Sequence, residues 1–251
     1  MSAVLTHLHE GWAELVLNRP ERRNAIEGTL AQAMDEALEA LERNDDVRAV
    51  VLRGANAAFC SGLDLKAFGE QPAPEWVARF PSLWDSVHTR LLGSRKAWVV
   101  ALERFAINGG AALALAGDVM VCGQSAFLQV GEIAIGMAAP RNAAWLALRH
   151  CEAVAARLCL MGERVPASEL LRLGLATEVV PDDDVVARAQ AIARTIGGYP
   201  AKGVAGIKSA MRAATMQMPP AQWLAACARH DPLAAPAAAI PPAAASAGNR
   251  G

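Results

Sequence analysis

The sequence has few aromatic residues, few cysteines and almost no net charge. Phe, Trp and Tyr make up 5 % of its 251 residues, and its five cysteines form no Cys-x-x-Cys pair. An odd number of unclustered cysteines argues against a disulfide framework or a zinc ribbon, so we expect a protein of the reducing cytoplasm. A formal net charge of −1 offers no overall field to a polyanion, so we expect no nucleic-acid partner.

Long uncharged apolar runs are also missing. No stretch approaches the ~18 residues of a membrane span, and the first residues, MSAVLTHLHEGW, have no basic segment followed by an apolar one. We therefore expect neither a membrane partner nor export. The five histidines have no HExxH or other ligand spacing, so no metal site is predicted.

The sequence is instead rich in apolar residues, which make up 53 % of it and suffice for a substantial core. Strand-like and helix-like segments alternate along it. Four segments have the composition of strands: 12–17, 47–54, 97–102 and 119–122. Helical patterns occupy 29–43, 75–92, 107–117 and, with a break near Gly162 and Pro166, 143–173. This alternation predicts an α/β layered fold.

Beyond Asp182 the pattern is helical, over Val185–Ile196 and Ala201–Met216, and it is interpreted as a helical appendage. The last residues are an Ala/Pro-rich segment that cannot bury much large apolar surface, so we expect a mobile tail. The predicted organisation is a core of residues 1–195, a C-terminal helical region of 196–230 and a tail of 231–251.

Two segments place glycine directly after a predicted buried strand. They are RGANAAFCSGLDLK, residues 53–66, and ERFAINGGAALALAGD, residues 103–118. A helix N-terminus has unpaired N–H groups and a favourable dipole for negative charge, and Gly109 and Gly110 have no Cβ to keep a ligand away. An isolated Gly-Gly pair is more often explained by close helix packing. The companion loop at 53–66 favours ligand binding here.

With LNRPERRNAIE near the N-terminus and GEIAIGMAAP at 131–140, these loops resemble the crotonase family, the enoyl-CoA hydratase/isomerase superfamily. The resemblance extends from about Val16 to about Ile207 and rests on the order and spacing of four motifs. It implies an α/β spiral of repeated ββα units with a C-terminal helical region. It also implies an acyl-CoA substrate, no cofactor apart from the CoA of that substrate, and a homotrimer or hexamer.

The resemblance also implies catalytic roles. The backbone N–H groups of Leu63 and Gly109 would stabilise a thioester enolate, at about 3 kcal/mol for each donor. Glu132 matches the family's second carboxylate, whereas the position of the hydratases' other glutamate falls on Ala112. One base beside an oxyanion hole can move a proton along an allylic system, so isomerisation is favoured over hydration. Hydration, decarboxylation and non-catalytic acyl-CoA binding stay open as alternatives.

Substrate-binding residues follow from the same motifs. Those implied to contact CoA are Arg22, Arg23, Ala25, Ser61, Asp64, Leu65 and Lys66. The three cations among them would meet phosphate groups, and backbone groups around Asp64 and Leu65 would meet the adenine. The chain departs from the family pattern at Glu103-Arg104, where Asn-Gly is usual, and at Asn108, which replaces one glycine of the usual triple. Cys60 has no histidine tied to it and is interpreted as a buried, inert thiol.

Overall fold

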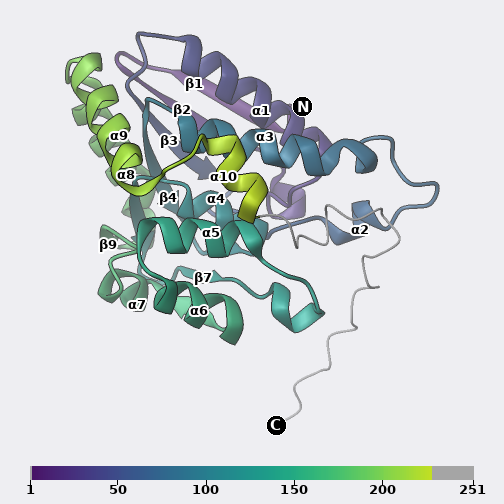
Figure 1. The fold of residues 1–251 in the computed structure, drawn as a ribbon. Helices are drawn as coiled ribbons and strands as arrows, with labels where there is room; N and C mark the ends of the chain where they lie inside the picture. The colour runs from purple at the N-terminus through teal and green to yellow at the C-terminus, as the bar shows by residue number, and fades with distance from the viewer. Residues whose placement is uncertain (1, 228–251) are drawn as a thin grey trace.

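The computed structural model describes residues 2–227, so the predicted tail of 231–251 lies outside the described residues. Its strands form two sheets, which helices surround (Figure 1). The main sheet has the strand order β1-β2-β3-β4-β6-β9, and a smaller sheet has the order β5-β7-β8. The strands of the main sheet are β1 (Val4–Leu8), β2 (Trp12–Leu17), β3 (Ala49–Gly54), β4 (Ala97–Leu102), β6 (Val119–Gly123) and β9 (Glu178–Val180). Those of the smaller sheet are β5 (Phe105–Ile107), β7 (Phe127–Gln129) and β8 (Arg164–Pro166).

Strands β2, β3, β4, β6 and β9 run parallel to one another, and β1 pairs antiparallel with β2 at the edge of the main sheet. Helices connect most of the parallel strands. The helices are α1 (Gly28–Arg43), α2 (Leu65–Phe68), α3 (Phe80–Gly93), α4 (Gly109–Leu115), α5 (Pro140–Arg149), α6 (Glu152–Met161), α7 (Ala167–Arg172), α8 (Val185–Gly197), α9 (Ala201–Thr215) and α10 (Pro220–Cys227). Short 3₁₀ turns are η1 (Pro20–Arg22), η2 (Val77–Arg79), η3 (Glu132–Ile135) and η4 (Asp182–Asp184). None of these helices is long and apolar enough to cross a membrane.

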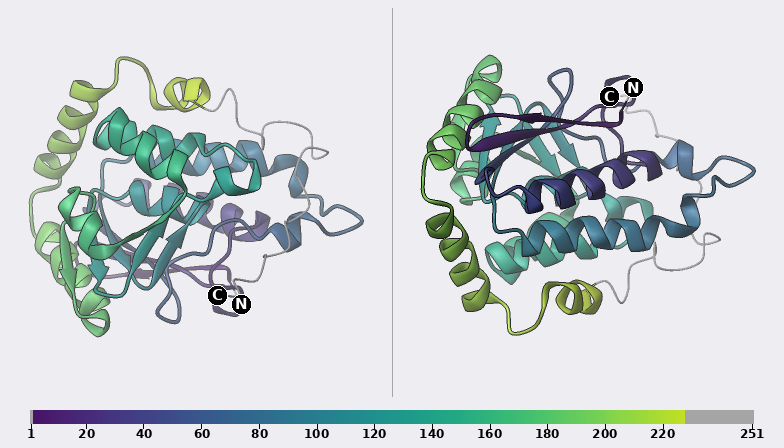
Figure 2. Two further views of the ribbon diagram at one scale, coloured as in Figure 1. Left: turned by 90° about the horizontal axis from the view of Figure 1, so that it is seen from below. Right: turned by 90° about the horizontal axis from the view of Figure 1, so that it is seen from above.

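Helices cover both faces of the main sheet, which explains the uninterrupted apolar runs of its central strands. On one face α1 and α3 lie side by side, and α4 and α5 continue this layer (Figure 2). Helix α1 packs through apolar residues at helical spacing, among them Leu30, Met34 and Leu38, which are buried. The core between these helices and the sheet supports the loops that follow β3 and β4.

The second face is covered by α8, which corrects the prediction of a helical appendage beyond Asp182. Val185, Ala189 and Ala193 are fully buried and pack with Val51 and Val99 of the sheet. Their four-residue spacing places them on one side of the helix, and small side chains let the helix approach the strands closely. Helix α8 is therefore part of the central core.

The predicted break in the helical stretch of 143–173 contains a short strand. Arg164–Pro166 form β8, which pairs antiparallel with β7 and sets Val165 opposite Leu128. Three residues are too few for a strand period to show in a sequence, and the flanking helices dominate the pattern. The predicted break is confirmed, since Gly162 ends α6 with φ of 64°.

Helix α9 is attached to the core by a buried ion cluster. The Asp118 carboxylate accepts hydrogen bonds from Lys208 Nζ at 2.6 and 2.7 Å and from the backbone N–H of Trp98 at 2.8 Å. Burial by itself raises the pKa of Asp118, but the charges of Lys208 and Arg149 and these hydrogen bonds outweigh it, so the pKa lies below its ordinary value. The cluster joins the end of α4 to the C-terminal helices.

Candidate active site

A cavity of about 150 Å³ lies beside the two glycine loops. Its walls come from the loop after β3, from α3 and the start of α4, and from the segment joining η3 to α5. The lining residues are Ser61, Leu63, Leu65, Trp84, Asn108, Gly109, Ala112, Glu132, Ile135 and the run from Met137 to Asn142. Of the residues expected from the sequence, the cavity brings together Ser61, Leu63, Leu65, Gly109 and Glu132.

The backbone of Leu63 is held by pairing with Ile26. The Gly62 carbonyl accepts from the Ile26 N–H at 2.7 Å, and the Asp64 N–H donates to the Ile26 carbonyl at 2.8 Å. Because successive peptide groups of an extended segment point to opposite sides, the Leu63 N–H points away from Ile26. It donates to no acceptor within residues 2–227, and it belongs to a residue of the cavity wall.

Gly109 is the first residue of α4, where an N–H has no acceptor inside the helix. This N–H donates to no group in the described part of the chain. It shares a peptide unit with the Asn108 carbonyl, which accepts from the Ala112 N–H and from Asn142 Nδ2, both at 3.1 Å. Because C=O and N–H point in opposite directions in a trans peptide, these bonds fix the direction of the Gly109 N–H.

The two adjacent glycines have different roles in the packing. A Cβ on Gly110 would lie 2.6 Å from the Cys60 carbonyl oxygen, so this position admits no side chain. A Cβ on Gly109 would meet only side chains, that of Ile26 at 3.2 Å and those of Leu63 and Trp84 in the cavity wall at 3.8 Å. Gly110 is therefore required for close packing of the helix, whereas Gly109 leaves its N–H accessible to a ligand. The rest of α4 is buried, which accounts for its lack of charge.

Asn108 keeps a glycine-like backbone with φ of 54° and ψ of −118°. A non-glycine residue in this region is strained by about 1–3 kcal/mol. Two hydrogen bonds offset this strain. Asn108 Oδ1 accepts from the Gly131 N–H at 2.8 Å, and the backbone N–H of Asn108 donates to the Gln129 carbonyl at 2.8 Å. The departure from the family's glycine triple thus ties the loop of Gly109 to the turn that carries Glu132.

Glu132 begins η3, and its Oε1 accepts a hydrogen bond from Asn142 Nδ2 at 3.1 Å. Burial, followed by the nearby charge of Glu132, raises the pKa of the Cys159 thiol to about 12, so this neighbour is neutral. Among the described residues lining the cavity, Glu132 alone carries a carboxyl group, and Ala112 contributes only a methyl group. The cavity therefore combines one carboxylate with two unengaged backbone donors.

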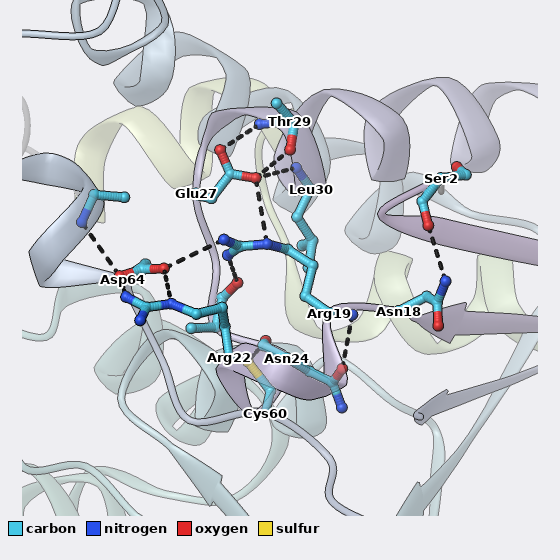
Figure 3. Close-up of polar contacts among 12 residues, drawn as sticks. Ser2, Asn18, Arg19, Arg22, Asn24, Glu27, Thr29, Leu30, Cys60 and Asp64 are labelled. Carbon is cyan, nitrogen blue, oxygen red and sulfur yellow. Dashed lines mark hydrogen bonds and ion pairs between the residues drawn. The ribbon is translucent and has the colours of Figure 1, made fainter. Parts of the chain in front are cut away.

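Arg22 and Asp64 bind each other in a polar cluster (Figure 3). Neither residue lines the cavity. Arg22 donates to the Asp64 carboxylate at 2.7 and 3.1 Å, and the same carboxylate caps α2 through the Ala67 N–H. Burial by itself raises the pKa of Asp64, but the hydrogen bonds from Arg22 and Ala67 lower it below its ordinary value. Asp64 therefore remains ionised and keeps α2 and the preceding loop in place.

Sequence reasoning missed Arg19, which joins the same cluster. It donates to the Ala25 carbonyl at 2.6 Å and to Asp64 at 3.3 Å. No signal in the segment LNRPERRNAIE distinguishes this arginine from the two that follow it, because all three are the same residue type within residues 19–23. Asn142 was also missed, since it lies 34 residues from Asn108 in the chain.

The other expected CoA contacts lie outside the cavity. Arg23 and Lys66 are exposed, and Ala25 is buried with its carbonyl bound to Arg19. The N–H groups of Asp64 and Leu65 already donate within the chain, and their carbonyl groups accept from the N–H groups of Phe68 and Gly69. Cys60 is buried, and burial raises the pKa of its thiol to about 12, as expected for an inert cysteine.

Comparisons with known proteins agree with this architecture. The family model for enoyl-CoA hydratase/isomerase matches residues 8–230. The chain is 31 % identical over 218 residues to 1,2-epoxyphenylacetyl-CoA isomerase of Escherichia coli, covering 85 % of this chain and 83 % of that protein. It is 31 % identical to carnitinyl-CoA dehydratase of Proteus mirabilis, covering 80 % of this chain and 76 % of that protein. The crystal structure of an enoyl-CoA hydratase/isomerase from Xanthobacter autotrophicus superposes with a TM-score of 0.83 at 30 % identity, covering 96 % and 89 % of the two chains, which confirms the predicted crotonase fold.

Proposed function

The chain belongs to the enoyl-CoA hydratase/isomerase family, and from this premise we propose that it isomerises an enoyl-CoA by a proton shuttle through Glu132. In this proposal the thioester oxygen of a 3-enoyl-CoA lies between the N–H groups of Leu63 and Gly109. The Glu132 carboxylate removes a proton from the α carbon, and the electron pair delocalises onto the thioester oxygen. The same carboxyl group then returns the proton to the γ carbon, giving a 2-enoyl-CoA.

The observation that carries this proposal is the single carboxyl group among the described residues of the cavity. An isomerisation needs one group that accepts and returns one proton, and no water takes part. A hydratase of this family uses two carboxylates on one water, and Ala112 stands at the second position. The fully uncharged helix α4 supplies no replacement.

Hydration or dehydration is the second candidate, because proteins named as dehydratase and as hydratase/isomerase match at nearly the same identity as the one named as an isomerase. Decarboxylation of a thioester requires only the two N–H donors, so it is the third. Loss of chemistry with retained acyl-CoA binding is the alternative outside catalysis.

The remaining features of the proposal concern binding and assembly. Arg23 and Lys66 are exposed beside the loop of Leu63, where they are free to meet CoA phosphates. We include a homotrimer or hexamer, supported by the exposed apolar side chains of Ile207 and Met211 on α9. The five free cysteines support a cytoplasmic location.

The test compares both reactions in the wild-type protein and in Glu132→Gln. We expect conversion of a 3-enoyl-CoA to its 2-enoyl isomer, with slow or no hydration of a 2-enoyl-CoA. The variant should lose about 10²–10⁴-fold in kcat while still binding acyl-CoA. Fast hydration by the wild-type protein contradicts the isomerase assignment, and binding without turnover of any thioester contradicts catalysis altogether.

A further inference from the structure

We propose that Asn142 is a positioning residue whose single side-chain amide aligns both halves of the catalytic apparatus, the Gly109 N–H and the Glu132 carboxylate. This inference rests on the function proposed above and assigns a role within the same site. Asn142 lies in the first turn of α5, lines the cavity and is 2 % exposed. No motif in the sequence indicated it.

The geometry places the two hydrogens of one NH₂ group on two acceptors. Asn142 Nδ2 is 3.1 Å from the Asn108 carbonyl oxygen and 3.1 Å from Glu132 Oε1. An amide nitrogen has two N–H bonds, so both contacts are made at once. The Asn142 Oδ1 atom is buried and has no hydrogen-bond partner within the described residues. The Asn142 side chain thus uses both N–H donors, while its buried carbonyl oxygen is left without a hydrogen bond among the described residues.

Each contact has a separate chemical effect. The bond to the Asn108 carbonyl holds the peptide unit whose other end is the Gly109 N–H, so that donor keeps its direction while charge develops on the thioester. The bond to Glu132 stabilises the ionised carboxylate, which is the form that accepts a proton. It also holds the carboxylate beside the peptide of the oxyanion donor. One side chain therefore fixes the base relative to the donor.

The other charged or titratable residues around the cavity keep their identity when Asn142 is replaced. Arg141 lines the same cavity from α5 and donates to Asp85 of α3 at 2.6 Å. Cys159 of α6 is neutral, and α4 has no titratable side chain. A shift of the pH profile in an Asn142 variant therefore reports the loss of its own hydrogen bond.

The experiment measures kcat, KM and the pH dependence of kcat/KM for the wild-type protein, Asn142→Ala, Asn142→Leu and Asn142→Gln. The two variants without a donor should lose about tenfold or more in kcat with KM changed by less than about threefold. The acid limb of their pH profile should move upward by about 1 pH unit. Asn142→Gln keeps an amide and should recover part of kcat. Asn142→Leu fills the volume that Asn142→Ala empties, so the comparison remains available if one of them folds poorly.

The control is Asn44→Ala. Asn44 does not line the cavity, and its Oδ1 accepts a hydrogen bond of 3.0 Å from the Asp46 N–H. It should match the wild-type protein. If the wild-type protein is active and Glu132→Gln is not, but Asn142→Ala has an unchanged pH profile and kcat, the positioning role is refuted while the proposed function stands. If the wild-type protein and Glu132→Gln show the same turnover, the proposed function itself fails.

Discussion

Ala112 and Glu132 line one cavity, Ala112 from the buried helix α4 with a methyl group and Glu132 from η3 with the carboxyl group. Ala112 is only 1 % exposed and lines the cavity, so a longer side chain at this position would extend into the cavity. The pair defines the chemistry proposed for this site. A carboxyl group introduced at residue 112 therefore tests whether its absence is what favours isomerisation over hydration.

Ala112→Glu restores the second carboxylate of a hydratase, and we expect hydration of a 2-enoyl-CoA to rise by about 10²-fold over the wild-type protein. The measurement is loss of enoyl thioester absorbance at several pH values, because two neighbouring carboxylates raise one another's pKa. Ala112→Gln has the same size without the charge and serves as the control. Equal hydration by the two variants would show that the missing carboxylate does not limit the reaction.

Gly109→Ala and Gly110→Ala should separate function from packing. The Gly110 methyl group would overlap the Cys60 backbone, so this variant should lose about 1–3 kcal/mol in free energy of unfolding. The Gly109 methyl group meets only side chains at the cavity wall, so this variant should fold normally and lose about 10²-fold in kcat/KM. Denaturant unfolding and steady-state kinetics check the two outcomes. The reverse pattern would exchange the roles assigned to the glycines.

The ion cluster of Asp118 predicts an acid-sensitive attachment of α9. Because the pKa of Asp118 is lowered in the folded state, its ionised form stabilises the protein above about pH 3.9, the ordinary value of an unfolded aspartate. This contribution is lost as the pH falls through the lower folded pKa. Asp118→Asn leaves Lys208 buried without its anion and should cost about 3–5 kcal/mol near pH 7.

Unfolding curves between about pH 3 and 7 test this expectation. The stability of Asp118→Asn should fall less steeply with acid than that of the wild-type protein. Asp45→Asn is the control, since the Asp45 side chain is 89 % exposed. If the stability of Asp118→Asn falls with pH as steeply as that of the wild-type protein, other carboxylates cause the acid sensitivity.

Arg22 and Arg23 are neighbours with different expected roles, and truncated substrates distinguish them. Arg22→Met removes the partner of Asp64 and should lower kcat/KM equally for an acyl-CoA and for the matching acyl-pantetheine, which lacks the phosphates. Arg23→Gln should weaken only the acyl-CoA reaction, by about two- to fivefold, because an exposed cation contributes little. A selective effect of Arg22→Met on the acyl-CoA would instead make Arg22 a phosphate contact.

Much of the fold was visible in local patterns. The strand Ala97–Leu102 was predicted with its observed bounds, and helix α1 begins one residue earlier than predicted and ends where predicted, because their apolar periods are long enough to read. Strands β5, β7 and β8 have three residues each and depend on partners distant in the chain, so no local signal marked them. The position of α8 against the sheet was hidden for the same reason.

The sequence by itself determined the strand and helix alternation, the two glycine loops and the absence of a carboxylate at residue 112, because these depend only on residue type and short spacing. Tertiary structure alone decided that Gly110 packs on Cys60 while Gly109 lines the cavity, and that Asn142 bonds both Asn108 and Glu132. Such contacts join segments tens of residues apart. Their hydrogen bonds exist only after the sheet and its covering helices have packed, which no periodicity along the chain records.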